Sequence, residues 1–134
     1  MKRRQVLLWT SIAVAAAGCL GIGAPQSKRP RLAWIWLQND RDESYEVDVT
    51  VEDAGESVFT GSYKLGTEPD TADARVYNPV DGTGEYVVRV TMDGETREVD
   101  TTTLVDGAEN CIGVRFSLLN NRSVDYWTKS MREC

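Results

Sequence analysis

The sequence contains no histidine among its 134 residues. Histidine is the usual base that activates a serine or cysteine nucleophile, and its ring nitrogen is a common ligand of zinc and copper. Its absence removes Ser-His and Cys-His catalysis, His-ligated zinc sites and blue-copper sites. We therefore expect a protein that is not an enzyme, with no catalytic residues, no metal centre and no cofactor.

Lysine is also scarce, with four residues in the chain, and the formal net charge is −6. Between Gln38 and Asp125, 20 acidic side chains stand against 7 basic ones. Nucleic-acid phosphates would repel such a chain, so we expect no nucleic-acid partner. High acidity with little lysine predicts a surface that stays hydrated in concentrated salt. An ordinary acidic surface, kept soluble by its charge, is the alternative.

Long apolar runs are absent except at the start of the chain. Lys2, Arg3 and Arg4 precede an apolar segment, Val6–Ala17, and the small residues before Cys19 follow directly. Positive charge, an apolar core and a small-residue site together are typical of an export signal. A cysteine in this place indicates a lipobox, where the chain is cut and the cysteine is lipidated. We predict a signal peptide over residues 1–18, with its lipobox at residues 16–19, and a lipid on Cys19.

Two details of this segment stay open. Arg3-Arg4-Gln5-Val6-Leu7-Leu8 resembles the signal of the twin-arginine pathway, although the two arginines could also serve only as positive charge. Residues 5–27 carry no charge and could instead remain as an uncleaved membrane helix. Either outcome leaves the protein bound to the cell membrane, on its extracellular face.

After the signal, residues 19–31 read as a tether rich in glycine and proline, which rests on anionic lipid headgroups or is simply solvated. Residues 32–134 show the alternation of β-strands and no sustained helical period. This pattern predicts one all-β domain, an immunoglobulin-like sandwich of seven to eight short strands after an N-terminal signal helix. The strand order does not follow from the pattern, and a transthyretin-like or cupredoxin-like sandwich is the alternative. The expected strands are Leu32–Leu37, Tyr45–Glu52, Val58–Leu65, Ala74–Val80, Tyr86–Met92, Glu95–Thr103, Ile112–Leu118 and Val124–Trp127.

Two features of this sandwich are predicted in more detail. Asp93-Gly94 between alternating segments indicates a tight hairpin. The segment Leu32–Leu37 is apolar at every position, which favours a strand that is buried on both faces. We also expect four aromatic residues to belong to the core and not to a ligand platform: Trp34, Trp36, Tyr126 and Trp127.

Several stretches together resemble the small secreted lipoproteins of halophilic archaea. Besides the signal and the acidic composition, they are Trp36-Leu37-Gln38-Asn39-Asp40, Tyr45–Val51, Val58-Phe59, Glu85–Val90 and Cys111-Ile112-Gly113-Val114. The resemblance covers most of the chain, and the lipobox is its specific motif. It implies an extracytoplasmic Ig-like domain, mostly of unknown activity, and it supplies no catalytic residues.

If Cys19 carries a lipid, Cys111 and Cys134 remain, and an even pair in an exported protein favours a disulfide. Cys111 alternates with the inward Ile112, so we place it on the outer side of its strand, where it could tie down a polar C-terminal tail. Two free thiols, or a bridge between two chains through Cys134, are the alternatives.

The remaining candidate sites are three acidic clusters and one sequon. The clusters are Asp40/Asp42/Glu43, Asp70/Asp73 and Asp81–Glu85, and none has the spacing of an EF-hand loop. Asn121-Arg122-Ser123 is an N-glycosylation sequon in an expected turn, at Asn121. We expect a non-enzymatic binding or accessory domain at the cell envelope, with an envelope protein as partner. A calcium- or ligand-binding lipoprotein that uses the acidic loops is the alternative.

Overall fold

The computed structural model describes residues 28–105 and 110–134. The expected signal helix, Cys19 and most of the tether lie outside the described residues. No helix within the described ranges is long and apolar enough to cross a membrane.

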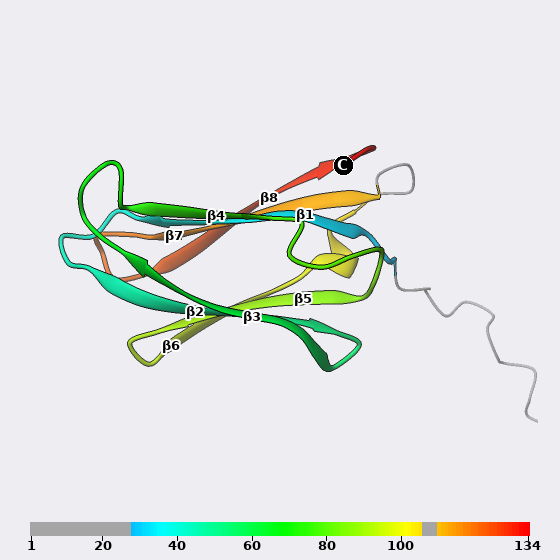
Figure 1. Ribbon diagram of the computed structural model, residues 1–134, viewed down its shortest axis with the longest axis horizontal. Helices are drawn as coiled ribbons and strands as arrows, with labels where there is room; N and C mark the ends of the chain where they lie inside the picture. The colour runs from blue at the N-terminus through cyan, green and yellow to red at the C-terminus, as the bar shows by residue number, and fades with distance from the viewer. Residues whose placement is uncertain (1–27, 106–109) are drawn as a thin grey trace, which may run out of the picture.

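The chain forms an all-β sandwich of two four-stranded sheets that lie face to face (Figure 1). One sheet has the strand order β4-β1-β7-β8 and the other has the order β3-β2-β5-β6. The strands are β1 (Arg31–Asn39), β2 (Tyr45–Asp53), β3 (Glu56–Leu65), β4 (Asp73–Tyr77), β5 (Tyr86–Met92), β6 (Glu95–Asp100), β7 (Cys111–Leu118) and β8 (Val124–Met131). The predicted architecture and strand number are confirmed.

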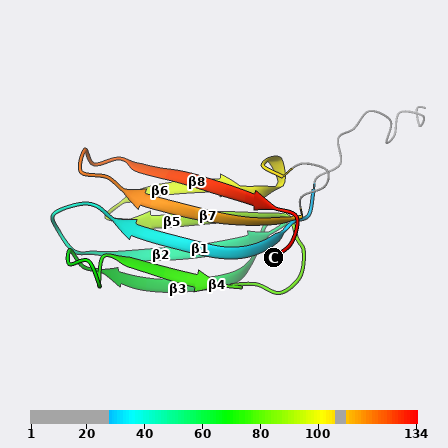
Figure 2. The same ribbon diagram turned by 90° about the horizontal axis from the view of Figure 1, so that it is seen from above.

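Strand β1 lies inside its sheet, antiparallel to β4 and parallel to β7. The first strand of the domain is thereby held between segments that follow it by roughly forty and eighty positions. Seen from above, β1 begins at the same end of the sandwich at which the chain reaches its C-terminus (Figure 2). We call this the near end, which holds residues 28–31, 78–85, 101–105 and 132–134; the far end holds the turns at residues 40–44, 66–72, 93–94 and 119–123.

The tight hairpin predicted at Asp93-Gly94 is present, and both of its residues have positive φ, +47° and +81°. Ala54-Gly55 forms a second turn of the same kind, with φ of +51° and +91°. Positive φ at both central residues matches the twist of the flanking strands, which is why Asp-Gly is favoured there. At Ala54 the hairpin imposes this conformation on a residue that carries a Cβ.

The core lies between the two sheets and is made by the alternating apolar residues of six strands. Phe116 and Leu37 are fully buried in it, and so are Val47, Val49 and Val51, the inward face of β2. The strand at Tyr45–Val51 therefore has the half-buried pattern that its sequence predicts.

Two predicted strands end earlier than expected. The segment Ala74–Val80 leaves the sheet after Tyr77, because Asn78 takes a φ of +50° and Pro79 has no N–H for a ladder. The segment Glu95–Thr103 ends at Asp100, whose carboxylate accepts a hydrogen bond from the backbone N–H of Thr102 at 3.0 Å. That bond caps a short 3-10 helix, η2 (Thr101–Thr103).

Strand β1 corrects a further expectation, that it is buried on both faces. Its register with β7 shifts between Leu32 and Trp34, so Ala33 is an extra residue in the pairing. Such a bulge interrupts the strict alternation of a strand. Leu32, Ile35 and Leu37 consequently point into the core, while Trp34 lies on the outer face of the sheet.

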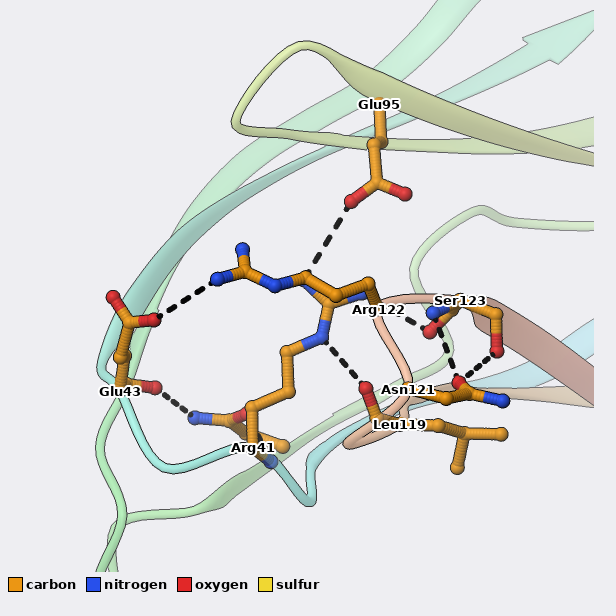
Figure 3. Close-up of polar contacts among 8 residues, drawn as sticks. Arg41, Glu43, Glu95, Leu119, Asn121, Arg122 and Ser123 are labelled. Carbon is orange, nitrogen blue, oxygen red and sulfur yellow. Dashed lines mark hydrogen bonds and ion pairs between the residues drawn. The ribbon is translucent and has the colours of Figure 1, made fainter.

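The far end is fastened by Arg41, whose side chain is only 4% exposed. Its Nε donates to the carbonyl of Leu119 at 2.9 Å and its Nη2 to the carbonyl of Ser123 at 3.1 Å (Figure 3). Its Nη1 lies 3.5 Å from Oε1 of Glu95, and the guanidinium stacks over the ring of Tyr45. One arginine thus joins the β1–β2 turn to the β7–β8 turn and to the β5–β6 hairpin.

Asn39, which is also buried, extends this network. Its Oδ1 accepts from the backbone N–H of Arg41 at 3.0 Å, and its Nδ2 donates to the carbonyls of Glu43 and Gly66 at 2.8 and 2.9 Å. Most polar groups buried at this end are therefore hydrogen-bonded to the backbone, whereas Nη1 of Arg41 has no hydrogen-bond partner among the described residues and meets only the carboxylate of Glu95.

Candidate functional site

On the outer face of the β4-β1-β7-β8 sheet, two neighbouring rows of residues carry mostly large side chains. The register of the strands fixes these rows, because partners across a sheet stand side by side on one face. The first row is Tyr77, Trp34, Gly113 and Lys129, and the second is Arg75, Trp36, Arg115 and Trp127.

In the second row, arginines and tryptophans alternate and stack. The guanidinium carbon of Arg75 lies 3.9 Å from the centre of the Trp36 ring, and that of Arg115 lies 5.2 Å from it. Arg115 also lies 5.3 Å from the ring centre of Trp127. These distances are those of cation–π contacts. Because Arg75 and Arg115 come from the strands on either side of β1, Trp36 is held from both sides.

Asp73 fixes one end of this row. Its Oδ2 accepts a hydrogen bond from Nε1 of Trp36 at 3.0 Å and lies 3.7 Å from Nε of Arg75. The carboxylate that sequence analysis placed in an acidic cluster therefore orients a tryptophan and an arginine.

In the first row, the indole of Trp34 lies over Gly113. A Cβ built on Gly113 would overlap the six-membered ring of that indole. The glycine has no positive φ, so the need here is for close approach and not for an unusual backbone conformation. Trp34 can therefore form a floor across β1 and β7.

These side chains enclose an open groove of about 280 Å³ on the face of the sheet. It is lined by Trp34, Trp36, Arg75, Tyr77, Trp127 and Lys129. Tyr77 and Trp127 stand at opposite sides of it, on the two edge strands, and are 63% and 48% exposed. The expectation that Trp34, Trp36 and Trp127 belong to the core is wrong: none is part of the core cluster.

Tyr126, the fourth aromatic residue expected in the core, is 40% exposed and lies outside the groove as well. It follows the inward period of β8, but β8 is an edge strand and its inner face is only partly covered. The guanidinium of Arg97, from β6 in the opposite sheet, lies 5.1 Å from the ring centre of Tyr126. This contact covers the open edge between the two sheets.

The predicted disulfide between Cys111 and Cys134 is present, with a Cα–Cα distance of 5.5 Å. Cys111 is fully buried but is not part of the core cluster, in agreement with a position on the outer side of β7. It shares that side with Gly113, two residues further along. The bridge therefore lies beside the floor of the groove.

The expectation that the disulfide alone ties down the polar C-terminal tail needs correction. Strand β8 continues to Met131 and pairs with β7 along its whole length, down to the partners Cys111 and Met131. The ladder itself therefore holds the segment beyond Trp127. The disulfide fastens only the last three residues, 132–134.

The groove concentrates positive charge on an acidic protein. Lys129 and Arg115 form no ion pair with any residue that the structure describes. Nε of Arg115 is buried without a hydrogen-bond partner there. On the outer face of the other sheet, Arg89 is instead neutralised by Glu52 at 3.1 Å and Glu98 at 2.6 Å. The hydrogen bonds with these two carboxylates raise the pKa of Arg89.

The remaining predicted sites lie away from the groove. Within residues 28–105 and 110–134, no three acidic or cysteine side chains are close enough to hold a metal ion. Asn121 is exposed at the far end, and its Oδ1 accepts hydrogen bonds from the backbone N–H and Oγ of Ser123, at 3.1 and 2.6 Å. Glycosylation of Asn121 stays a prediction.

Lys28 and Arg29, which were expected in a free tether, contact the domain. Nζ of Lys28 donates to the carbonyl of Val105 at 3.1 Å, and Arg29 pairs with Glu85 at 3.2 Å. The tether is therefore joined to the near end of the sandwich before β1 begins.

Two four-stranded sheets packed face to face form a β-sandwich, the architecture that Ig-like domains share with other all-β proteins. The chain belongs to the halobacterial Ig-like domain family, whose model matches residues 43–116, more than half of its 134 residues. This membership supports the halophilic character that the charge composition predicts. Trp34, Trp36 and Trp127 lie outside the matched segment, so the family match alone says nothing of the groove.

One solved structure that matches is that of a candidate cell adhesion protein from Bacteroides ovatus, with 10% sequence identity and a TM-score of 0.40. The match covers 74% of this chain, and the chain spans 44% of that protein's length. A likeness at this level says nothing of what this chain binds. Among curated proteins, none matches significantly.

Proposed function

We propose that this protein is a lipid-anchored Ig-like domain that binds a component of the cell envelope on the extracellular face of the membrane, without catalysis. The binding surface is the groove on the outer face of the β4-β1-β7-β8 sheet. The observation that carries this proposal is that groove: three tryptophans and a tyrosine stand on an open sheet face, outside the core.

The groove is a built feature and not a loose patch of surface. Arg75, Arg115 and Asp73 hold the ring of Trp36 in place, and Gly113 makes room for Trp34. Clusters of aromatic residues with arginine, set in a hollow, are typical of binding surfaces. Preorganised rings lose little further freedom when a ligand binds.

The proposed anchor fits the direction in which the chain enters the domain. Residues 19–27 reach at most about 30 Å when fully extended. With a lipid on Cys19, the near end of the sandwich would face the membrane. The groove would then open sideways, toward other molecules of the envelope.

The anchor is tested by fractionating cells that carry the wild-type chain or Cys19→Ser. We expect the wild-type protein in the membrane fraction, beginning at a lipidated Cys19, and the variant to lose both the lipid and the attachment. Cys134→Ser is the matched control and should stay in the membrane fraction. An intact mass that includes Met1 in the wild-type protein contradicts the lipid anchor.

Binding through the groove is tested separately, with the unanchored Cys19→Ser protein added to washed cell envelopes. We expect the envelopes to retain it, and we expect Trp127→Ala in the same background to abolish retention. Tyr126→Ala is the matched control, since Tyr126 is a similarly exposed neighbour on β8 that lies outside the groove. Equal retention of all three proteins contradicts the groove as the binding surface.

A further inference from the structure

We infer that the ligand of the groove is an acidic saccharide, a short chain of sugar rings that carries carboxylate or sulfate groups. This inference rests on the proposed function, because it names the ligand class of the same groove.

The charged groups of the groove that are free to meet a ligand are cationic donors, and the exposed Tyr77 adds a neutral hydroxyl. Lys129 has no ionic partner in the described part of the chain, and Arg75 is half exposed. The acceptor beside them, Asp73, already binds Trp36 and Arg75. A ligand must therefore supply acceptors, and charged oxygens make the strongest hydrogen bonds with these groups.

The ring surfaces favour flat partners. Trp36 is held from both sides by arginines and so serves as a wall. Trp34, which covers Gly113 with one face, leaves its other face toward the groove, and Tyr77 and Trp127 stand beside it. A sugar ring matches this arrangement, because its C–H face is apolar while its hydroxyl and acidic groups project from the edge.

A peptide matches the groove less well. The backbone groups beneath it are already paired in the ladders of β1 with β4 and β7 and of β7 with β8, so a bound peptide would leave its own N–H groups without partners. A membrane surface is too flat to reach the floor of a concave groove.

The dimensions indicate a ligand of more than one ring. Arg75 and Lys129 lie on β4 and β8, the two edges of the sheet, which are three strand spacings or roughly 14 Å apart. Acidic groups on separate rings could meet the two cations if the saccharide ran across the strands. Its middle would then lie over Trp34.

Concentrated salt suits this mode of binding. At molar salt the Debye length is about 3 Å, so the repulsion between an acidic protein and an acidic ligand is screened, while stacking in contact persists. We therefore expect affinity to change little, less than about threefold, between roughly 1 M and 3 M KCl, unlike binding by charge alone.

The test uses the full chain with Cys19→Ser, titrated in about 2 M KCl and followed by tryptophan fluorescence and calorimetry. The probes are oligogalacturonate and a sulfated oligosaccharide, with neutral galacto-oligosaccharide of the same length as the control. We expect both acidic probes to bind at least about tenfold more tightly than the neutral one. Trp127→Ala should weaken binding of all probes by about tenfold or more.

Lys129→Gln separates the contribution of positive charge to binding from that of the aromatic rings. It should weaken the acidic probes by about fivefold and leave the neutral probe unchanged. Lys64→Gln, an exposed lysine on β3 of the other sheet, is the matched control and should change neither. Neutral and acidic probes that bind equally, with no effect of Lys129→Gln, would overturn the acidic requirement.

Two further probes distinguish other occupants. Polyglutamate binding as tightly as oligogalacturonate, or vesicles with anionic headgroups binding through Trp127, would overturn the saccharide assignment. If no saccharide binds while envelopes still retain the protein in a Trp127-dependent manner, the ligand class is wrong and the proposed function stands. If retention is absent as well, both are wrong.

Discussion

The indole of Trp34 on β1 lies over Gly113 on β7, in the space that the Cβ of any other residue would occupy. These two strands are parallel neighbours inside their sheet, so this contact lies at the centre of the groove. The shape of the outer face at this point therefore depends on the absence of a side chain at Gly113.

Gly113→Ala is expected to displace Trp34 from the floor of the groove. The added methyl group cannot share the space of the ring, and overpacking of this kind costs typically 1–3 kcal/mol of folding free energy. Chemical denaturation measures the cost, and a shift in tryptophan emission reports the moved ring. Ser117→Ala, on the same side of β7, is the control; an unchanged emission spectrum in Gly113→Ala contradicts the contact.

Arg41→Ala is expected to lower the free energy of unfolding by about 2–4 kcal/mol, because two hydrogen bonds from a buried charged donor are lost, although the carbonyls of Leu119 and Ser123 each keep one backbone N–H donor. Arg122→Ala is the matched control. Arg122 lies at the same end, is 69% exposed and pairs with Glu43 at 3.7 Å, so its loss should cost less than about 0.5 kcal/mol. Equal effects in urea denaturation would show that Arg41 does not fasten the turns.

The sequence predicts the strands of this fold well where local pattern alone decides them. Apolar and polar residues alternate without interruption at Tyr45–Val51, and Asp93 and Gly94 both adopt the positive φ that a tight hairpin needs. Both features are therefore found where expected. At Leu32–Leu37 the local pattern does not decide the structure. Every position is apolar, so the sequence does not show that Ala33 is an extra residue in the pairing of β1 with β7.

The groove could not be predicted in the same way, because it depends on the register of four strands from distant parts of the chain. One signal was available: Trp34/Trp36, Arg75/Tyr77 and Trp127/Lys129 are each spaced by two residues, which puts both members of a pair on one face of a strand. That these three pairs share one face follows only from the pairing of β1 with β4 and β7 and of β7 with β8.

Replacing Cys111 and Cys134 by serine should lower the free energy of unfolding by roughly 3 kcal/mol, since the bridge closes a loop with a sequence separation of 23 residues. Because the ladder with β7 reaches Met131, hydrogen exchange should increase only at residues 132–134 and not along β8. Thermal melting of the oxidised and reduced wild-type protein gives an independent measure. Loss of protection along all of β8 would show that the bridge, and not the ladder, holds this strand.

Salt should stabilise the protein. Between Gln38 and Asp125, 20 acidic side chains outnumber 7 basic ones, so the excess negative charges repel one another in dilute buffer, and molar salt screens this repulsion. We expect the melting temperature to rise steadily from about 0.1 M to 3 M KCl. Sucrose of equal osmolality is the control for general solvent effects, and a melting temperature that does not change with KCl contradicts the halophilic interpretation of the surface.

Alkaline pH should act through Tyr86, which is buried at the near end. Its hydroxyl donates to the carbonyls of Asp81 and Gly82, at 3.1 and 2.9 Å. Burial, followed by the nearby charge of Asp53, raises the pKa of Tyr86 above its usual 10.0. The neutral phenol is therefore favoured by folding. Its contribution to stability is complete below the pKa of the unfolded chain, about 10, and is lost as the pH rises through the higher folded value.

Tyr86→Phe should cost about 1 kcal/mol at neutral pH, where a hydroxyl with two carbonyl acceptors is lost. Between about pH 10 and 12 the stability of the wild-type protein should fall toward that of the variant, because ionisation removes the donor that the phenylalanine never had. Urea denaturation of both proteins over this range isolates Tyr86 from other groups that titrate there. If the free energies of unfolding of the wild type and Tyr86→Phe differ by a constant amount up to pH 12, ionisation of this hydroxyl does not destabilise the fold.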